Sequence, residues 1–137
     1  MLKKDIYNTI MKNGKKNVSE KIFLKISKDL QKTPKNAQSV FKIAILNSSP
    51  VIFLKQIKRR RKQTTEFPFL LKPKLRISYG VKILISSCKI NKNNNFSKNF
   101  KTEVLNSASK IGQSFIRRNE IHKNSFLKKK FSNYRWF

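Results

Sequence analysis

Positive charge constrains this chain more than any other feature of its sequence. The 137 residues include 33 Lys and Arg but only 6 Asp and Glu, which gives a formal net charge of +27 at pH 7. Self-repulsion of this size destabilises a compact state unless an anion lies alongside it. Because basic residues occur along the whole chain, we expect a polyanion that contacts several faces of the fold, and nucleic acid is such a partner.

A membrane partner fits the sequence less well than nucleic acid. The longest uncharged apolar runs, such as residues 51–54, are too short to span or anchor in a bilayer. Residues 1–6 show neither the apolar core of a secretory signal nor an Arg- and Ser-rich transit peptide, so we expect a protein that is made where it works. The hydrophobic content of 38% predicts a folded core, and the length suits one domain, residues 1–137.

Catalytic and metal-binding patterns are not evident in the sequence. The six acidic residues are scattered, and three glycines cannot form a dinucleotide-binding fingerprint. The single cysteine, Cys88, excludes an internal disulfide, and with only one histidine no His/Cys zinc site of ordinary spacing can form. His122 is the one candidate base, and its basic neighbours Arg118 and Lys123 discourage its protonation. We therefore expect no enzyme, no cofactor and no metal.

Helical spacing of apolar residues predicts a mainly α fold. Residues 2–12, about 17–32, 36–47 and 76–90, a stretch from Phe96 and residues 115–137 all show it. In the second stretch, Asn17 and Glu20 resemble a capping box, followed by the stripe Val18, Ile22, Ile26 and Leu30. The third stretch places Ala37, Val40, Phe41, Ala44 and Ile45 on one side. We expect a bundle of about six helices.

Residues 51–72 predict a β-hairpin arm that protrudes from this bundle. Two β-prone runs, residues 51–54 and 67–71, flank a basic tip. Pro68 suits only an edge position, which agrees with an arm standing off the body. The basic tip consists of Lys58, Arg59, Arg60, Arg61 and Lys62.

Residues 76–90 have the composition of a strand but the spacing of a helix. Their apolar positions follow i, i+4, i+7, i+8 and i+11, and they are Ile77, Val81, Leu84, Ile85 and Cys88. We predict a helix, at a cost of about 1 kcal/mol for Gly80 inside it. Cys88 is expected to be a small buried hydrophobe rather than a reactive thiol.

The final stretch, residues 115–137, contains no Gly or Pro, so a helix can run through it. Leu127, Phe131 and Tyr134 would share one side of that helix, which can bury. The remaining positions are strongly basic, and they include Arg117, Arg118, Lys123, Lys128, Lys129, Lys130 and Arg135. A solvated basic face is the alternative to an interface, and we favour the interface because the whole chain is basic.

Two motifs resemble the family of ribosomal protein seven of the small subunit. Near the C-terminus, Arg117-Arg118, Glu120, His122 and then Phe131-x-x-Tyr134-Arg135-Trp136 reproduce the family's His-to-Trp spacing. Near the N-terminus, Gly14-Lys15-Lys16 followed by Glu20 resembles the family's Gly-Lys-Lys motif. Between them, Pro73 and Arg76 match the start of a family helix, and the stretch from Phe96 to Gly112 matches another helix and its closing glycine. The arm departs from the family pattern, since it has no Gly pair and carries Thr65 near the usual Tyr.

The resemblance implies a structural constituent of the small ribosomal subunit. Such a protein binds the 3′ major (head) domain of small-subunit rRNA, nucleates head assembly, and places its arm near E-site tRNA and the mRNA exit path. Its protein partners would be neighbouring head proteins and ribosomal protein eleven of the small subunit, with no membrane and no homo-oligomer. The abundance of Lys, Asn, Ile and Phe, which have A/T-rich codons, favours an organelle-encoded protein. The altered arm tip favours a mitochondrion, with a plastid as the alternative.

The residues expected to contact RNA follow from the charge pattern together with this resemblance. For rRNA they are Lys15, Lys16, Arg76, Lys82, Arg117, Arg118, His122, Lys123, Lys128, Lys129, Lys130, Tyr134, Arg135 and Trp136. The arm tip, residues 58–62, is expected to contact rRNA or tRNA. Tyr134 and Trp136 could stack on unpaired bases, while Trp136 could equally pack the helix end against the bundle. Two other functions stay open: a free-standing nucleic-acid-packaging protein and a membrane-active cationic protein.

Overall fold

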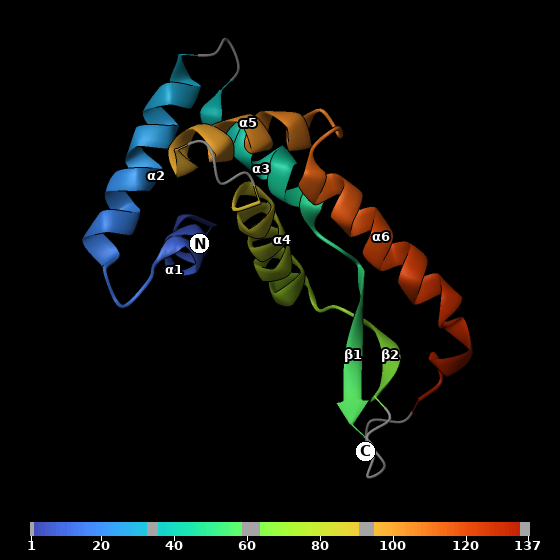
Figure 1. Cartoon of the computed structure of the whole chain (residues 1–137). Helices are drawn as coiled ribbons and strands as arrows, with labels where there is room; N and C mark the ends of the chain where they lie inside the picture. Colours follow the sequence, from blue (N-terminus) through green and yellow to red (C-terminus); the bar gives the residue numbers. More distant parts are fainter. Residues whose placement is uncertain (1, 33–35, 59–63, 91–94, 135–137) are drawn as a thin grey trace.

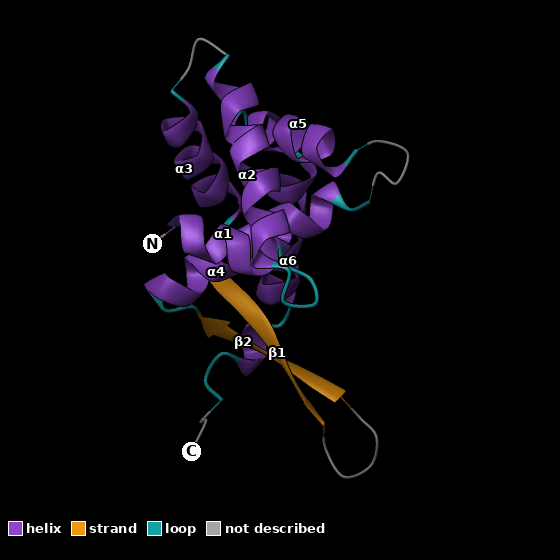
Figure 2. Cartoon of the chain, turned by 90° about the vertical axis from the view of Figure 1, so that its left-hand side faces the viewer, coloured by secondary structure: helices purple, strands orange, loops and turns teal. Residues whose placement is uncertain are grey.

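Helices make up most of the structure, and one hairpin extends from them. The computed structural model describes residues 2–32, 36–58, 64–90 and 95–134. Over these ranges the chain forms α1 (Leu2–Ile10), α2 (Lys16–Gln31), α3 (Ala37–Ser48), β1 (Ile52–Lys58), β2 (Thr64–Leu70), α4 (Pro73–Cys88), α5 (Phe96–Ala108), α6 (Gln113–Leu127) and a short 3-10 helix, η1 (Lys129–Phe131). The mainly α fold class with a hairpin arm is confirmed, and Figure 2 shows the strands reaching away from the helices.

One apolar core joins α1 to α5. Aromatic rings follow one another through it, with centroid separations of 5.1, 5.4, 6.2 and 5.8 Å along the series Tyr7, Phe23, Phe41, Phe100 and Phe96. Helix α3 packs against α4, α5 and α6, so it lies at the centre of the bundle (Figure 1). The stripe predicted for residues 36–47 is confirmed, since all five of its apolar residues are buried.

Helix α2 departs from two details of the predicted pattern. Its N-cap is Lys15, which makes no side-chain capping bond, so the predicted capping box at Asn17 is wrong. The buried stripe is also rotated, because Val18 is 51% exposed. The residues that face the core are Ser19, Phe23, Ile26 and Leu30, with Ile22 packed partly against it. The helix turns Phe23 inward because its ring lies between Tyr7 and Phe41, a tertiary contact that local spacing does not reveal.

Helix α4 follows the predicted spacing, and Gly80 explains how closely it packs. Val81, Leu84, Ile85 and Cys88 are buried in the core, which confirms the helix over the strand-like composition. A Cβ on Gly80 would lie 3.0 Å from the carbonyl oxygen of Ile45 and 3.0 Å from Cβ of Ser49. Gly80 therefore permits α4 to approach the end of α3 more closely than a larger residue would.

The connection from α5 to α6 depends on backbone bonds and on a buried carboxylate. Lys110 takes the left-handed conformation with φ 64°, and the amide of Ile111 donates to the carbonyl of Asn106 at 2.9 Å, which closes α5 in a Schellman motif. Gly112, predicted as the closing glycine, has φ −64° and is instead the N-cap of α6. Its missing side chain leaves room for Glu103, whose Oε1 would lie 2.8 Å from a Cβ there.

Glu103 ties the first turn of α6 to α5. Its Oε1 accepts a hydrogen bond from the backbone amide of Ser114 at 2.8 Å and one from the hydroxyl of Ser107 at 3.2 Å. The hydroxyl of Ser48, on α3, donates to that of Ser114 at 3.0 Å. This buried network fixes where α6 leaves the bundle, because each of the three helices contributes a bonded group.

The arm is an antiparallel pair in regular register. Ile52 pairs with Leu70, and the register continues through Leu54 opposite Pro68 to Lys58 opposite Thr64. Pro68 is compatible with this pairing because each strand of a two-stranded ribbon is an edge strand. The predicted arm, residues 51–72, is confirmed as a hairpin between β1 and β2.

The basic C-terminal stretch does not continue as one helix, contrary to the prediction. Helix α6 ends at Leu127, and the short helix η1 follows it. Leu127 is 77% exposed, whereas Phe131 and Tyr134 pack against Phe67 of β2, with ring centroids 5.5 and 4.2 Å apart. The chain turns after α6 because Phe67, which is 3% exposed, offers a better apolar contact than solvent does.

Candidate nucleic-acid interface

Helices α4 and α6 bring several of the predicted basic residues into one region beside the root of the arm. The two helices pack against each other, and α6 also packs against β1 (Figure 1). Arg117 on α6 donates from Nη1 to the hydroxyl of Ser86 on α4 at 2.8 Å. Arg76 on α4 donates from Nε to the hydroxyl of Ser49 at 3.3 Å, next to the end of α3.

Arg76, Arg118 and His122, two guanidinium cations and one imidazole, lie at the root of the arm, and we call them the root cluster. Burial, and then the positive charge of Arg76, lowers the pKa of Arg118. Burial likewise lowers the pKa of His122, followed by the charges of Arg118 and Arg76. Arg76 binds Ser49 and His122 binds Val51, two residues further along the chain, so the root cluster places positive charge beside the start of the arm.

His122 connects the root cluster to the arm. Its Nε2 accepts a hydrogen bond from the backbone amide of Val51, with 3.1 Å between the nitrogens, just before β1 begins. An imidazole that accepts at Nε2 is neutral and carries its proton on Nδ1. The lowered pKa agrees with this neutral form, as the sequence predicted. A hydrogen bond from His122 to a phosphate would therefore be donated by Nδ1, because Nε2 already accepts one from Val51 at the root of the arm.

The guanidinium group of Arg118 is fixed by two neighbours on α6. It lies over the ring of Phe115, with 4.4 Å between Cζ and the ring centroid. It also donates from Nε and Nη2 to Oδ1 of Asn119 at 3.2 and 2.8 Å. A guanidinium held in one plane loses little conformational entropy when it binds a phosphate, which suits Arg118 to this role.

Three other predicted lysines lie on exposed faces away from the root cluster. Lys15 and Lys16 begin α2, and Nζ of Lys16 lies 3.7 Å from Oε1 of Glu20 in a solvent-exposed ion pair that contributes little to stability. Lys82 projects from α4 with its Nζ 5.5 Å from the ring centroid of Tyr79. The basic residues thus occupy several faces of the fold.

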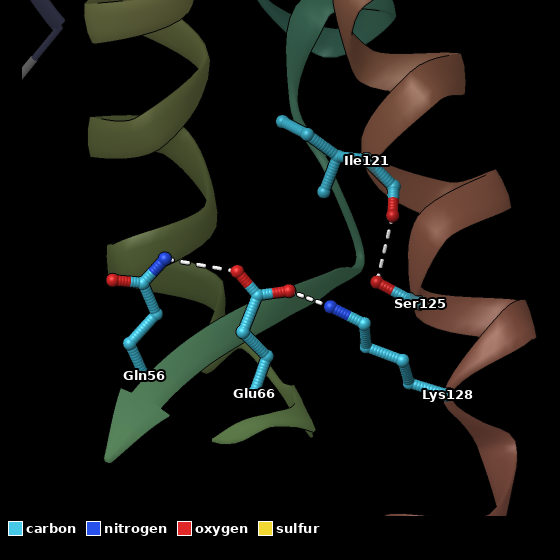
Figure 3. A network of polar contacts seen from close by, with 5 residues as sticks. All are labelled: Gln56, Glu66, Ile121, Ser125 and Lys128. Carbon is cyan, nitrogen blue, oxygen red and sulfur yellow. Dashed lines mark hydrogen bonds and ion pairs between the residues drawn. The ribbon is translucent and has the colours of Figure 1, made fainter. Parts of the chain in front are cut away.

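The lysines that follow α6 are placed differently from one another. Lys128 forms an ion pair with Glu66 of β2, and Gln56 of β1 donates to the other carboxylate oxygen of Glu66 at 2.9 Å (Figure 3). Lys129 and Lys130 are exposed on η1. The charge of Lys128 is therefore paired within the fold.

In the last turns of α6, the hydroxyl of the buried Ser125 donates to the carbonyl of Ile121 at 2.7 Å, as Figure 3 shows.

Some predicted contact residues lie outside the part of the chain that the structure describes. They are Arg59, Arg60, Arg61 and Lys62 of the arm tip, and Arg135 and Trp136 at the C-terminus. Lys58, the first residue of the predicted tip, is the exposed last residue of β1. Lys123 is exposed on α6, one residue after His122.

Sequence reasoning missed an aromatic face on the arm. Phe53 and Phe69 pair across the hairpin with 6.2 Å between ring centroids, and Tyr79 of α4 lies 4.5 Å from Phe53. These three rings line an open groove together with Tyr134. The available signal was the presence of a Phe in each of the two runs predicted as strands, since every second side chain of a strand lies on one face and paired strands can bring such rings together. The groove combines flat rings with the basic Lys55 and so can receive unpaired bases.

The described residues contain neither a metal-binding cluster nor a helix suited to a membrane. No group of three or more His, Cys, Asp or Glu there could hold a metal ion. No helix in the same ranges is both long enough and apolar enough to cross a bilayer. Cys88 is 3% exposed, and burial, followed by the charge of Glu103, raises the pKa of its thiol to about 12. The expected buried, unreactive cysteine is confirmed.

Comparison with known proteins identifies the family. The family model for ribosomal protein S7p/S5e matches residues 2–129. A small ribosomal subunit protein uS7 from Thermodesulfovibrio yellowstonii is 31% identical over 134 residues, covering 96% of this chain and 84% of that protein. The uS7 protein of Thermomicrobium roseum is 29% identical, covering 94% and 83%. A uS7c protein from Euglena longa is 29% identical, covering 85% and 66%.

These matches agree with the motifs at the two ends of the chain and with the helical fold and its arm. The chain therefore belongs to the ribosomal protein S7p/S5e family, and it is a non-enzymatic structural constituent of the small ribosomal subunit.

Proposed function

We propose that the chain binds the 3′ major (head) domain of small-subunit rRNA and nucleates assembly of the head, acting as one rRNA-binding domain. The observation that carries this proposal is the root cluster, where Arg76, Arg118 and His122 gather at the junction of α4, α6 and the arm. The two guanidinium charges at this junction favour a bound anion, and an arginine fork is suited to phosphate. The other predicted rRNA contacts within the described residues would add further binding faces on α2, α4, α6 and η1.

The arm extends the same proposal to other partners. It reaches away from the helices, so its basic tip would approach E-site tRNA and the mRNA exit path beside ribosomal protein eleven of the small subunit (Figure 2). Folded RNA presents narrow phosphate clefts that a two-stranded ribbon can enter and a helix bundle cannot. Tyr134 packs one side on Phe67 and is 38% exposed, so its role would be to extend the aromatic face toward a base.

We also propose that the protein works in an organelle, in mitochondria rather than plastids. The abundance of residues with A/T-rich codons supports an organelle, and the Euglena longa uS7c protein shows that similar chains include an organellar one. The altered arm, which has no Gly pair, is the feature that favours mitochondria over plastids. Immunogold labelling or fractionation of the source cells tests it, and recovery of the chain with plastid ribosomes would overturn the choice.

Sedimentation tests whether the chain belongs to assembled subunits. A lysate is separated on a gradient at moderate salt, and the protein is expected to migrate with small subunits. A protein that stays at the top while small subunits migrate would contradict the ribosomal assignment. A free-standing packaging protein would instead follow DNA and would bind duplexes without sequence preference.

The root cluster is tested by substitution. Arg118→Ala and Arg76→Ala are each expected to weaken binding to a transcript of the rRNA head domain by about 10-fold or more, since a charge-assisted bond contributes about 1.5–3 kcal/mol. Lys25→Ala, on an exposed position of α2, is the matched control and is expected to change affinity little. Equal effects of all three substitutions would show that only total charge matters.

Salt dependence gives an independent measure of phosphate contacts. If about 6–10 phosphates are neutralised, affinity is expected to fall about 10³–10⁵-fold between roughly 50 and 200 mM salt. A response that is nearly flat over this range would contradict binding dominated by phosphates.

A further inference from the structure

A second concave site lies on the bundle, away from the root cluster and from the arm. It has a volume of about 300 Å³ and lies where the α1–α2 turn meets the end of α4 and the start of α5. Its floor is apolar and is formed by Ile10, Met11, Ile22 and Phe96. Ile10 belongs to the core, whereas Met11, Ile22 and Phe96 are only partly covered. The pocket is large enough for a nucleobase with its ribose, at the lower end of typical ligand sites.

The rim of this pocket is positively charged. Lys12, Lys15 and Lys89 line it, and all three residues are exposed. They come from separate places: the α1–α2 turn supplies Lys12 and Lys15, and Lys89 is the C-cap of α4. Among the described residues, no Asp or Glu lines the pocket. Three like charges around one opening are complementary to an anion.

The combination of rim and floor restricts what kind of anion fits. An isolated phosphate would satisfy the lysines but leave the apolar floor unused. A hydrophobic peptide would cover the floor but bring no negative charge to the rim. A nucleotide supplies both parts, because its base has an apolar face that stacks on side chains such as Phe96 and its phosphate binds lysine ammonium groups.

We infer that this pocket holds one unpaired nucleotide of the small-subunit rRNA, with its base on the apolar floor and its phosphate bound by Lys12, Lys15 and Lys89. The inference rests on the proposed rRNA binding and deepens it, since it assigns a base-accepting site and adds Lys12 and Lys89 to the contact surface. The base must be unpaired because a paired base cannot present its face to a protein.

Nucleotide binding to the free chain is tested by nuclear magnetic resonance with labelled methionine methyl groups. The sequence contains two methionines, so Met11 in the pocket is the probe and Met1 is an internal reference. Adenosine monophosphate is expected to shift the Met11 methyl signal upfield in a saturable manner. Ribose 5-phosphate and inorganic phosphate are expected to leave it nearly unchanged. Equal shifts with all three compounds, or no shift with any, would overturn the inference.

Substitutions at the pocket provide a second test with matched controls. Val18 lines the pocket and is 51% exposed, so Val18→Trp fills the opening without entering the core. Leu24→Trp is the control, because Leu24 is 53% exposed on the same helix and does not line the pocket. Val18→Trp is expected to abolish the nucleotide-induced shift of Met11 and to lower affinity for the rRNA head-domain transcript by about 5- to 150-fold, the range for losing one stacked base. Leu24→Trp is expected to do neither.

The rim is tested in the same two assays. Lys89→Glu is expected to weaken both nucleotide and transcript binding at least about 10-fold more than Lys25→Glu, an exposed position outside the pocket, since a local phosphate contact is lost as well as charge. Equal effects of the two reversals would overturn the rim contact.

Failure of the pocket and failure of the proposed function give different results. If Val18→Trp binds the transcript as tightly as Leu24→Trp, while the wild-type chain still migrates with small subunits, the pocket inference alone is wrong. If the wild-type chain does not migrate with small subunits but adenosine monophosphate still shifts Met11, the rRNA assignment is wrong and the pocket binds a nucleotide from another source.

Discussion

At the residue scale, the informative positions are those where a tertiary neighbour restricts which side chain fits. Gly80 lies in the middle of α4, where glycine lowers helix propensity, and its local sequence offers no reason for it. The reason is the backbone of α3, because the carbonyl oxygen of Ile45 lies only 3.0 Å from the position that a Cβ at residue 80 would occupy. The sequence predicted the cost of this glycine but not its purpose.

In Gly80→Ala the new Cβ meets the Ile45 carbonyl and the Ser49 backbone, which cannot easily move, and such overpacking costs about 1–3 kcal/mol. The gain in helix propensity, about 1 kcal/mol, offsets part of this cost, so we expect a net destabilisation of up to about 2 kcal/mol. Urea unfolding measures the change. Ser78→Ala on the same helix is the control and is expected to be neutral or slightly stabilising. A variant at position 80 more stable than wild type would refute the close-packing explanation.

His122 predicts how stability depends on pH. Burial and the charges of Arg118 and Arg76 hold its pKa below the ordinary 6.5, so the folded state binds fewer protons than the unfolded state. Stability is therefore expected to fall as pH drops through about 6.5, and the loss is complete once pH is below the folded pKa. His122→Gln, which can still accept from Val51, should remove this part of the dependence. Identical pH profiles for wild type and variant, measured by thermal unfolding, would be contrary to this expectation.

At the element scale, α6 and the segment that follows it are coupled to the arm. His122 accepts from Val51 at the root of the arm, Lys128 pairs with Glu66, and Phe131 packs on Phe67. These contacts explain why the basic C-terminal stretch turns back after Leu127, where a continuous helix was predicted. Helical periodicity continued beyond this residue, but the arm supplied apolar and acidic partners that the periodicity could not take into account.

Phe67→Ala tests the coupling of the C-terminal segment to the arm. Phe67 is 3% exposed beneath Phe131 and Tyr134, and truncating a buried Phe typically costs about 3–5 kcal/mol. Amide hydrogen exchange is expected to accelerate in β2 and η1. The matched control is Phe126→Ala, since Phe126 is 73% exposed and its loss should change stability by at most about 0.5 kcal/mol. Similar effects of the two truncations would show that the segment does not depend on Phe67.

At the scale of the whole molecule, a chain of 137 residues with one apolar core carries a formal net charge of +27. Basic residues lie at the start of α2, on α4, on α6 and on η1, so no single face carries the charge. Such a distribution suits a protein that is surrounded by RNA on several sides, whereas a basic patch on one face would suit a protein that only docks on it.

Salt is therefore expected to stabilise the free protein. Raising ionic strength from about 0.02 M to about 0.3 M shortens the Debye length and screens repulsion among the lysines and arginines. The thermal midpoint should rise over this range, and differential scanning calorimetry would measure it. Sucrose of the same osmolarity serves as the control, because it leaves charges unscreened. A midpoint that falls with salt would mean that ion pairs such as Lys128–Glu66 outweigh the repulsion.

The sequence by itself determined the fold class, the arm, the spacing of α3 and α4 and the family, because each depends on local periodicity, turn residues or short motifs. Only the tertiary structure decided the rotation of α2, the end of α6 at Leu127, the role of Gly112 as an N-cap and the assembly of the root cluster. These features depend on which side chains meet after the helices pack, such as Phe23 between Tyr7 and Phe41, and Glu103 at the first turn of α6. Contacts between residues distant in sequence are what local pattern cannot encode.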